Sequence, residues 1–297
     1  MAIKTVKATV NGQVYNLTWD ESSSSYSATI SAPPKTSYNQ TDHYYPVSIE
    51  AEDDGGNKAV VNDKTPEFAE KLKLRVLEKV APTITVEYPT DSSAIASNTP
   101  TIRWSVQDDD SGVNKSTISI QIDSGAIITD DIITEPSENG FTCTYTPTAL
   151  QDGPHTFVLN ASDNDGNAAS AVSTTFTVDT VPPVLNVTSP SDNFITNKNI
   201  VTITGTTNDV TSSSVTLKIN EISVEVGPDG AFSHDFTLNE GNNTITIVAT
   251  DAVGKSATVV RHVKLDTSVP TFQEITITPN PVDAGKTYII TVKVVDA

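Results

Sequence analysis

The chain has 297 residues, of which 36% are hydrophobic and 19% are charged, and its formal net charge at pH 7 is −19. Such an acidic surface repels phosphate backbones and anionic lipid headgroups, so neither nucleic acid nor a membrane is expected as a partner. Cys143 is the only cysteine, which excludes a disulfide within the chain, so each hydrophobic core has to be sufficient by itself.

The composition favours strands over helices. The β-branched residues Thr, Val and Ile are abundant, whereas Met occurs once, and this balance predicts an all-β chain. Residues 1–5 lead directly into a strand pattern, with no apolar signal region and no apolar run of about 18 residues anywhere in the sequence. We therefore expect no signal peptide in this chain and no membrane-spanning helix.

One short motif occurs three times. In each copy an alanine is followed by an aspartate two residues later, and by a glycine and an Asn or Lys at the fifth and sixth positions, in 51–57, 161–167 and 249–255. The copies are about 90 to 110 residues apart, which exceeds the ~20–50 residue period of solenoid repeats. The sequence therefore predicts serial copies of a small domain, each with its own core.

Apolar and polar residues alternate in the segment that leads into each motif. Every second residue is apolar, at the same positions relative to the motif in all three copies: Val47, Ile49 and Ala51, then residues 157, 159 and 161, and then residues 245, 247 and 249. This alternation predicts a strand with one face on a core, and the motif after it predicts a hairpin turn. Prolines at 82, 182–183 and 270 mark stiff links. We expect domains at 1–79, 80–179 and 180–266, followed by a two-stranded segment at 267–297.

Several short strands within about 90 residues predict a two-sheet sandwich. The further strands are expected at 101–107, 116–122, 141–146, 201–205, 215–219 and 231–237. Val181-Pro182-Pro183, the Asp-Gly-x-His-x-Phe stretch at 152–157 and the motif at 161–167 together resemble bacterial immunoglobulin-like repeats. The resemblance implies tandem immunoglobulin-like β-sandwich domains in an extended string, and it covers 80–266 better than 1–79. Such repeats without a signal peptide are similar to tail-associated structural proteins of phages and prophages.

The first domain is rich in aromatic residues, and segment 38–44 mixes rings with amides and a carboxylate. Tyr38, Asn39, Asp42 and Tyr44 are therefore candidate ligand-binding residues for a bacterial surface glycan or protein. The alternative is that these rings belong to the core of the domain.

The immunoglobulin strand order places two acidic loops at one pole of the middle domain, beside Glu78. Asp108 and Asp110 follow one expected strand, and Asp163 and Asp165 follow another. Ca²⁺ takes six to eight oxygen ligands, so these four residues are candidate calcium ligands. The alternative is that aspartate simply favours turns, because no complete calcium-loop motif is present. No cofactor other than this possible Ca²⁺ is expected.

Other residues that could suggest chemistry have structural explanations. Tyr45 and His155 stand where immunoglobulin sandwiches place a corner tyrosine. Trp104 and Cys143 alternate with apolar neighbours in expected strands, which indicates core positions. The sequence contains no nucleophile-elbow, zinc-protease or phosphate-loop motif, so we expect a protein that is not an enzyme.

The last residues predict two strands, at 271–278 and 288–295. Two strands cannot bury enough apolar surface to be stable alone, and their edges invite pairing. Either the chain is truncated here, or segment 271–297 is completed by strands of another chain. The second alternative makes this segment an attachment point to other virion proteins.

Three functions are compatible with these features. The first is a non-enzymatic virion component of a phage or prophage, in the tail or baseplate region, whose domains contact the bacterial cell surface. The second is a bacterial surface adhesin or spacer, located at the cell surface or outside the cell. The third is a carbohydrate-binding accessory module of a polysaccharide-degrading enzyme.

The expected series of domains can be tested by small-angle X-ray scattering on the isolated protein. We expect a radius of gyration well above ~20 Å, the value for one compact globule of this length, because stiff links hold the domains apart. A radius near ~20 Å would contradict the expected extended string.

Overall fold

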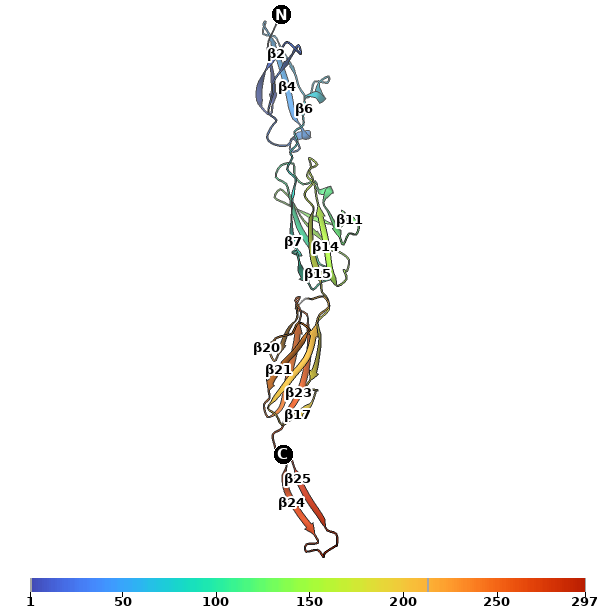
Figure 1. The fold of residues 1–297 in the computed structure, drawn as a ribbon. Coiled ribbons are helices and arrows are strands. Elements are labelled where there is room, and N and C mark those ends of the chain that lie inside the picture. The colour runs from blue at the N-terminus through green and yellow to red at the C-terminus, as the bar shows by residue number, and fades with distance from the viewer. Residues whose placement is uncertain (1, 213, 297) are drawn as a thin grey trace. The chain divides into compact units, whose positions relative to one another are not determined.

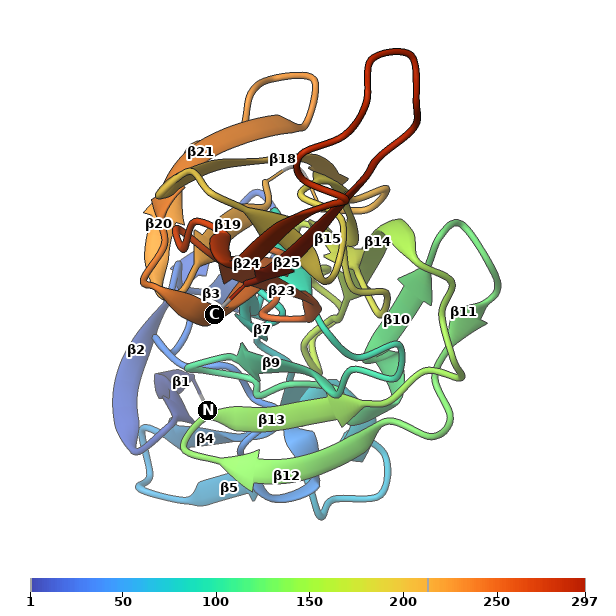
Figure 2. The same ribbon diagram turned by 90° about the horizontal axis from the view of Figure 1, so that it is seen from below.

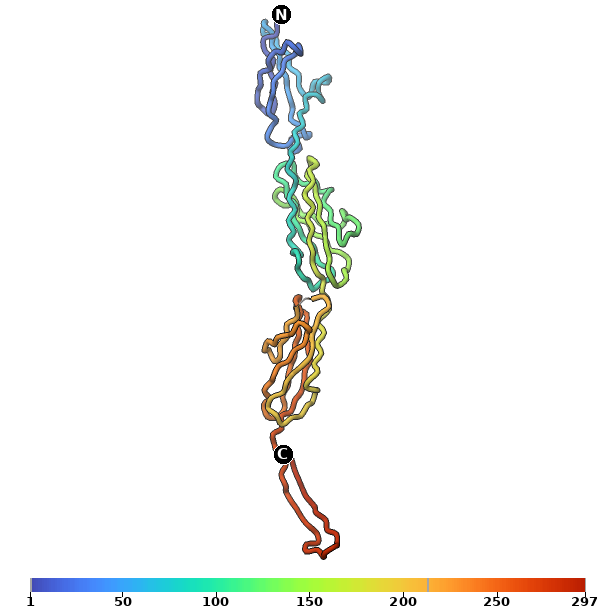
Figure 3. Tube along the Cα trace, viewed as in Figure 1, coloured from blue at the N-terminus to red at the C-terminus, as the bar shows by residue number. Residues whose placement is uncertain are grey.

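The computed structural model describes residues 2–212 and 214–296, and its regular secondary structure is almost wholly strands (Figure 1). Figure 3 follows the course of the chain through the domains. Its described helices are short 3-10 turns, η1 (Thr41–His43), η2 (Ala69–Leu72) and η3 (Lys115–Thr117). None of the described helices is long and apolar enough to cross a bilayer. The all-β fold is confirmed. The chain divides into two compact units, one ending at Val178 and the other beginning at Asp179.

The first domain forms one connected sheet. Its strands are β1 (Ile3–Val10), β2 (Gln13–Asp20), β3 (Ser25–Ser27), β4 (Tyr45–Asp53), β5 (Lys58–Val61) and β6 (Lys73–Leu74). Their order is β3-β2-β1-β4-β5, and β6 pairs with the start of β4. The strands described for 1–79 thus belong to one connected sheet, where the sequence predicts two. The segments at 28–44 and 62–72 contain prolines and are mostly irregular, so they supply no second sheet.

The middle domain is a sandwich of two sheets. Its strands are β7 (Thr83–Tyr88), β8 (Ser93–Ile95), β9 (Ile102–Gln107), β10 (Ser119–Ile122), β11 (Ile127–Ile128), β12 (Ile133–Ser137), β13 (Gly140–Tyr145), β14 (Gly153–Asn160) and β15 (Val172–Val178). One sheet has the order β12-β13-β9-β7 and the other β11-β10-β14-β15-β8. Trp104, Cys143 and Phe157 are fully buried in the core of this domain. The core positions expected for Trp104 and Cys143 are confirmed.

The third domain repeats this plan. Its strands are β16 (Val184–Ser189), β17 (Phe194–Thr196), β18 (Ile200–Asn208), β19 (Thr216–Ile219), β20 (Ile222–Val224), β21 (Ala231–Thr237), β22 (Gly241–Thr250) and β23 (Ser256–Leu265). One sheet has the order β16-β18-β21 and the other β17-β23-β22-β19-β20. Ile203 on the first sheet and Ile245 and Ile247 on the second are fully buried, as the alternation of β22 predicts.

The repeated motif forms the same tight turn in each domain. Asp53, Asp163 and Asp251 each accept a side-chain hydrogen bond from the backbone N–H four residues later, at 2.9, 2.7 and 2.8 Å. The glycine of each copy has a positive φ, between 80° and 91°, which glycine adopts without steric cost. The Asp and Gly of the motif are therefore required by the turn itself.

The described residues after the third domain form a hairpin. β24 (Thr271–Thr278) and β25 (Ile289–Val295) pair with each other, as the sequence predicts, and they are joined by a long loop, in dark red in Figure 2. Phe272, Ile275 and Ile289 are 69%, 60% and 68% exposed. The hairpin therefore buries little apolar surface within the described part of the chain.

Close packing between the strands of the third domain gives a testable prediction at Gly205 in β18. A Cβ at this position would lie 2.2 Å from the backbone oxygen of Asn186 and 2.6 Å from the ring of Phe232. Gly205→Ala should lower the free energy of unfolding by about 1–3 kcal/mol, the usual cost of overpacking. Urea unfolding of the full chain measures this effect. Thr206→Ala, at the adjacent exposed position, is the control, and an equal loss in both variants would contradict the prediction.

Candidate metal centre

Two of the four expected calcium ligands meet in the middle domain. Asp108 follows β9, Asp163 follows β14, and Glu78 lies on the link before β7. One carboxylate oxygen from each of these residues lies within 4.8 Å of the other two. Asp108 and Asp163 are 7% and 1% exposed. The two acidic loops thus converge beside Glu78, as the immunoglobulin strand order predicts.

The three carboxylates of this cluster also hold their own loops together. Asp108 Oδ1 accepts the N–H of Gly112 at 2.7 Å, and Glu78 Oε1 accepts the N–H of Ser111 at 2.9 Å. Asp163 Oδ2 accepts the side-chain amide of Asn167 at 2.6 Å. Much of the capacity of these oxygens is used within the turns, which is the alternative that the sequence left open. Calcium binding at this cluster stays a prediction.

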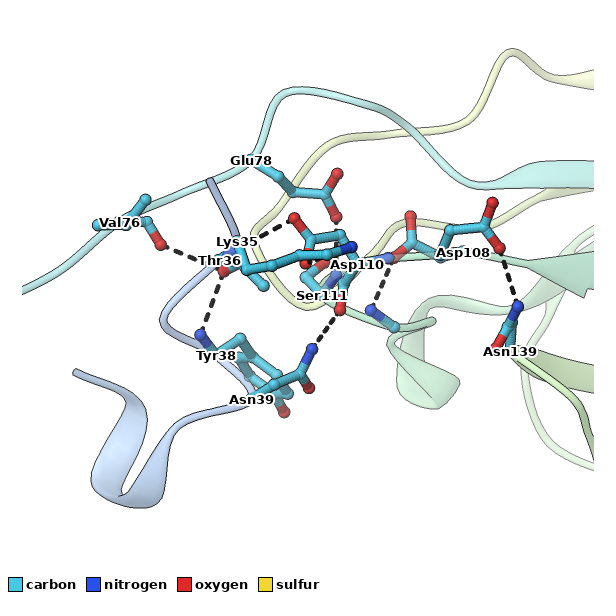
Figure 4. Close-up of polar contacts among 12 residues, drawn as sticks. Lys35, Thr36, Tyr38, Asn39, Val76, Glu78, Asp108, Asp110, Ser111 and Asn139 are labelled. Atoms are coloured by element: carbon cyan, nitrogen blue, oxygen red, sulfur yellow. Dashed lines mark hydrogen bonds and ion pairs between the residues drawn. The ribbon is translucent and has the colours of Figure 1, made fainter. Parts of the chain in front are cut away.

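The other two expected ligands, Asp110 and Asp165, lie outside this cluster and contact the first domain instead. Figure 4 shows Asp110 beside Lys35 and Thr36 of the first domain. Asp165 Oδ2 accepts the hydroxyl of Thr36 at 2.5 Å and the N–H of Glu78 at 3.0 Å. Asp110 Oδ2 accepts the N–H of Thr36 at 3.2 Å, and Lys35 lies 3.6 Å from its other oxygen. Asp110 and Asp165 therefore form a polar junction between the first and middle domains.

The candidate ligand-binding segment 38–44 belongs partly to this junction. The side-chain amide of Asn39 donates to the backbone oxygen of Asp110, and the Tyr38 ring stacks on His43 with 4.4 Å between ring centroids. Tyr44 is 7% exposed and donates its hydroxyl to Asp63 at 2.7 Å, a hydrogen bond that raises the pKa of Tyr44. These contacts support the domain and its junction. A ligand role for Tyr38, Asn39, Asp42 and Tyr44 stays a prediction.

Sequence reasoning missed Thr36, which belongs to the junction, and Ser37, which lies beside it within the first domain. They are 1% and 3% exposed. The Ser37 hydroxyl donates to the backbone oxygen of Val76 at 3.1 Å, and the Thr36 hydroxyl, which donates to Asp165, lies 3.2 Å from the same backbone oxygen. Tyr45, 3% exposed, donates its hydroxyl to the backbone oxygen of Lys35 at 3.1 Å. This contact supports the role expected for Tyr45 as a corner residue.

A second cluster of carboxylates, also missed from the sequence, lies in the third domain. Asp179, Asp209 and Asp251 each place one carboxylate oxygen within 4.8 Å of the other two. Each corresponds to a residue of the cluster in the middle domain. Asp179, like Glu78, stands four residues before a proline of the link, and Asp209, like Asp108, directly follows the second long strand of its domain. Asp251, like Asp163, is the aspartate of the repeated motif. An alignment of the repeats could have found them. Burial and the neighbouring carboxylates of Asp209 and Asp251 raise the pKa of Asp179.

The junction between the first two domains predicts a stability effect at Thr36. Thr36→Val keeps the shape of the side chain and removes the hydroxyl that donates to Asp165. The free energy of unfolding should fall by about 1–3 kcal/mol, because a polar group is left without its partner. Urea unfolding of the full chain is the measurement. Thr83→Val, at an exposed position of β7, is the matched control, and no difference between the two variants would contradict the importance of this contact.

Two known domain families match parts of the chain. The model of the family described as "Bacterial Ig domain" matches residues 82–159, and that of "Glucodextranase, domain B" matches residues 183–267. Bacillopeptidase F of Bacillus subtilis (strain 168) is 31% identical over 109 residues, which are 37% of this chain and 7% of that protein. The chain thus corresponds to a small part of this curated relative.

Several solved structures resemble the chain at low sequence identity. An I-band fragment of titin is 15% identical with a TM-score of 0.44, over 89% of this chain and 88% of that one. Fibronectin(III)-like modules of CbhA from Clostridium thermocellum are 18% identical with a TM-score of 0.37, over 62% and 94% of the two chains. Dimeric latent PorU from Porphyromonas gingivalis is 15% identical with a TM-score of 0.30, over 89% and 30%. The middle and third domains are immunoglobulin-like sandwiches by their own sheet order, and a family model matches each of them.

Proposed function

We propose that this chain is a non-enzymatic structural and binding protein, displayed outside a bacterial cell or on a virion. The observation that carries the proposal is the polar junction at Thr36, Asp110 and Asp165, where the acidic loops of one sandwich hold the domain before it. In an enzyme, loops at the pole of a scaffold commonly carry the reacting groups. Here the carboxylates of two such loops are bonded to the neighbouring domain, as a spacer requires.

The environments of the potential reactive groups support this proposal. Cys143 is fully buried, and burial raises the pKa of its thiol to about 12, so the nucleophilic thiolate is not formed near neutral pH. His155 has both ring nitrogens occupied, by Asp123 Oδ2 at 2.6 Å and by the backbone oxygen of Gln151 at 2.7 Å. Neither residue is available as a nucleophile or as a general base.

The second candidate is an accessory module of a degradative enzyme, and the comparisons favour it. One matching family is named after a glucodextranase and the curated relative is named a peptidase. Each match has the length of about one domain, so it relates a module of this chain to those proteins and carries no activity with it. A binding or spacer module is compatible both with a virion or surface protein and with an accessory module of an enzyme.

A contact with a cell-surface glycan or protein requires an exposed binding surface, and the first domain offers one on the ribbon of β2 and β3. Trp19 is 51% exposed and lies opposite Tyr26, with 5.2 Å between the ring centroids. Asp20, with hydroxyls of Ser22 and Ser23 bonded to it at 2.7 and 2.9 Å, follows directly. Aromatic rings beside polar groups are typical of binding surfaces. We place the contact here rather than at segment 38–44, whose groups are largely bonded within the protein.

The exposed hairpin of β24 and β25 is the proposed attachment point to other proteins of a virion or surface assembly. Its apolar residues are exposed and its outer strand edges are open to pairing in the described part of the chain. Strand addition from another chain would cover both. Within this proposal we favour the tail or baseplate region of a phage over an adhesin.

The binding role is tested with fluorescently labelled full chain and intact bacterial cells or purified cell envelope. Trp19→Ser should weaken retention at least about tenfold, which is about 1.4 kcal/mol, because the exposed ring is lost from the contact. Phe68→Ser, at a 40% exposed ring of the same domain, is the control and should bind as the unaltered chain does. Equal retention of all three proteins would contradict this surface, and hydrolysis of envelope glycan or protein by the chain would contradict the non-enzymatic role.

A further inference from the structure

The carboxylate cluster of the third domain is formed by three segments that are far apart in the sequence. Asp179 precedes β16, Asp209 follows β18 and Asp251 follows β22. Asp179 is fully buried and Asp251 is 6% exposed. Three acidic groups are thus brought together where little water can screen their repulsion.

Each of these carboxylates uses one oxygen and leaves the other free. Oδ1 of Asp209 accepts the N–H of Ser212 at 2.8 Å, Oδ1 of Asp251 accepts the N–H of Lys255 at 2.8 Å, and Oδ1 of Asp179 accepts the hydroxyl of Thr211 at 3.2 Å. Oδ2 of all three residues is buried and has no hydrogen-bond partner among the described residues. Such free buried oxygens are rare in native structures and indicate a missing partner.

The charge of the cluster is also not balanced within the described part of the chain. No lysine, arginine or histidine there forms an ion pair with Asp179, Asp209 or Asp251. Lys255, the nearest cationic residue in the sequence, contributes its backbone N–H to Asp251. Buried carboxylates without a cation are strongly unfavourable, so either a cation or protons must compensate them.

The equivalent turns of the other domains show why the third domain differs. The side-chain amide of Asn57 donates to Asp53 Oδ2 at 2.9 Å, and that of Asn167 donates to Asp163 Oδ2 at 2.6 Å. In the third domain Lys255 occupies the position of this asparagine. The exchange of Asn for Lys removes the amide partner and leaves Asp251 Oδ2 available as a ligand.

We propose that Asp179, Asp209 and Asp251 bind one Ca²⁺ ion through their free Oδ2 atoms. A hard cation prefers oxygen ligands, and three carboxylates provide both the charge and the first three of the six to eight oxygens that Ca²⁺ takes. Water and oxygens of the surrounding loops complete the shell. The ion joins Asp179 to the two loops that carry Asp209 and Asp251, and it neutralises the repulsion between the three carboxylates.

The test uses the full chain, freed of metal with EDTA, and CaCl₂ as the only added ligand. Asp251→Asn is the informative variant, because the amide oxygen can still accept the turn N–H groups while an NH₂ group replaces Oδ2. Asp229→Asn is the matched control: Asp229 lies in the same domain, outside the cluster, and accepts the N–H of Ala231 at 3.1 Å. Calorimetric titration gives the stoichiometry, and ¹H–¹⁵N spectra report the amides of Ser212, Val253 and Lys255.

We expect calcium to shift these three amide signals in the unaltered chain and in Asp229→Asn, and to leave them unchanged in Asp251→Asn, which should bind one ion fewer. Millimolar calcium should raise the melting temperature of the third domain in the first two proteins by about 4 °C or more, as for roughly 1 kcal/mol in a domain of this size. Without calcium, Asp251→Asn should melt no lower than the unaltered chain, because it carries one repelling charge fewer.

Two outcomes would overturn the proposal. One is the same calcium response in Asp251→Asn as in the unaltered chain. The other is no response in the unaltered chain, in which case protons compensate the cluster. If Asp251→Asn does not fold, Asp179→Asn provides the same comparison. Asp163→Asn separates this site from the middle domain, since it should leave the calcium shifts of Ser212, Val253 and Lys255 intact.

Discussion

A carboxylate that accepts backbone N–H groups of its own turn recurs at the same place in all three domains, at Asp53, Asp163 and Asp251. This interaction fixes the tight connection after β4, β14 and β22, the strand that leads into the motif in each domain. The same aspartate also places a negative charge at one end of a sheet in each domain. The sandwiches therefore share a constraint: their acidic loops need a partner for the second carboxylate oxygen.

The chain meets this need in different ways. In the first and middle domains, an asparagine side chain four residues later donates to the second oxygen of Asp53 and of Asp163. At Asp165, the partner is the hydroxyl of Thr36 from the domain before it. In the third domain the described residues supply no partner for Asp251 Oδ2. One repeated turn can thus serve as a simple connection, a domain junction or a cation site.

The junction also bears on the stability of the first domain. Its fully or nearly buried apolar side chains among the described residues are Ala8, Val10, Tyr44 and Tyr45, a small core for a single sheet. Of its buried polar residues among those described, Thr36 bonds to the middle domain and Ser37 bonds to Val76 within the first domain. The first domain therefore depends on polar contacts to a degree that the middle and third domains, with their large apolar cores, do not.

The strand phase, the motif turns and the β fold follow from the amino-acid sequence alone. Alternation such as that of Ile245, Ile247 and Ala249 is a local property, and it names the buried face without knowledge of the rest of the chain. The aspartate and glycine of each turn act within five residues, so their role was also visible from the sequence. That the strands of residues 1–79 join in one sheet could be seen only in the folded chain, because the irregular segments between them carry no periodic signal. The fold also determines which carboxylates meet: Asp108 and Asp110 are two residues apart, yet one joins Glu78 and Asp163 while the other faces Thr36. Adjacent residues of a loop point in different directions, and what each one meets is set by segments that are distant in the sequence.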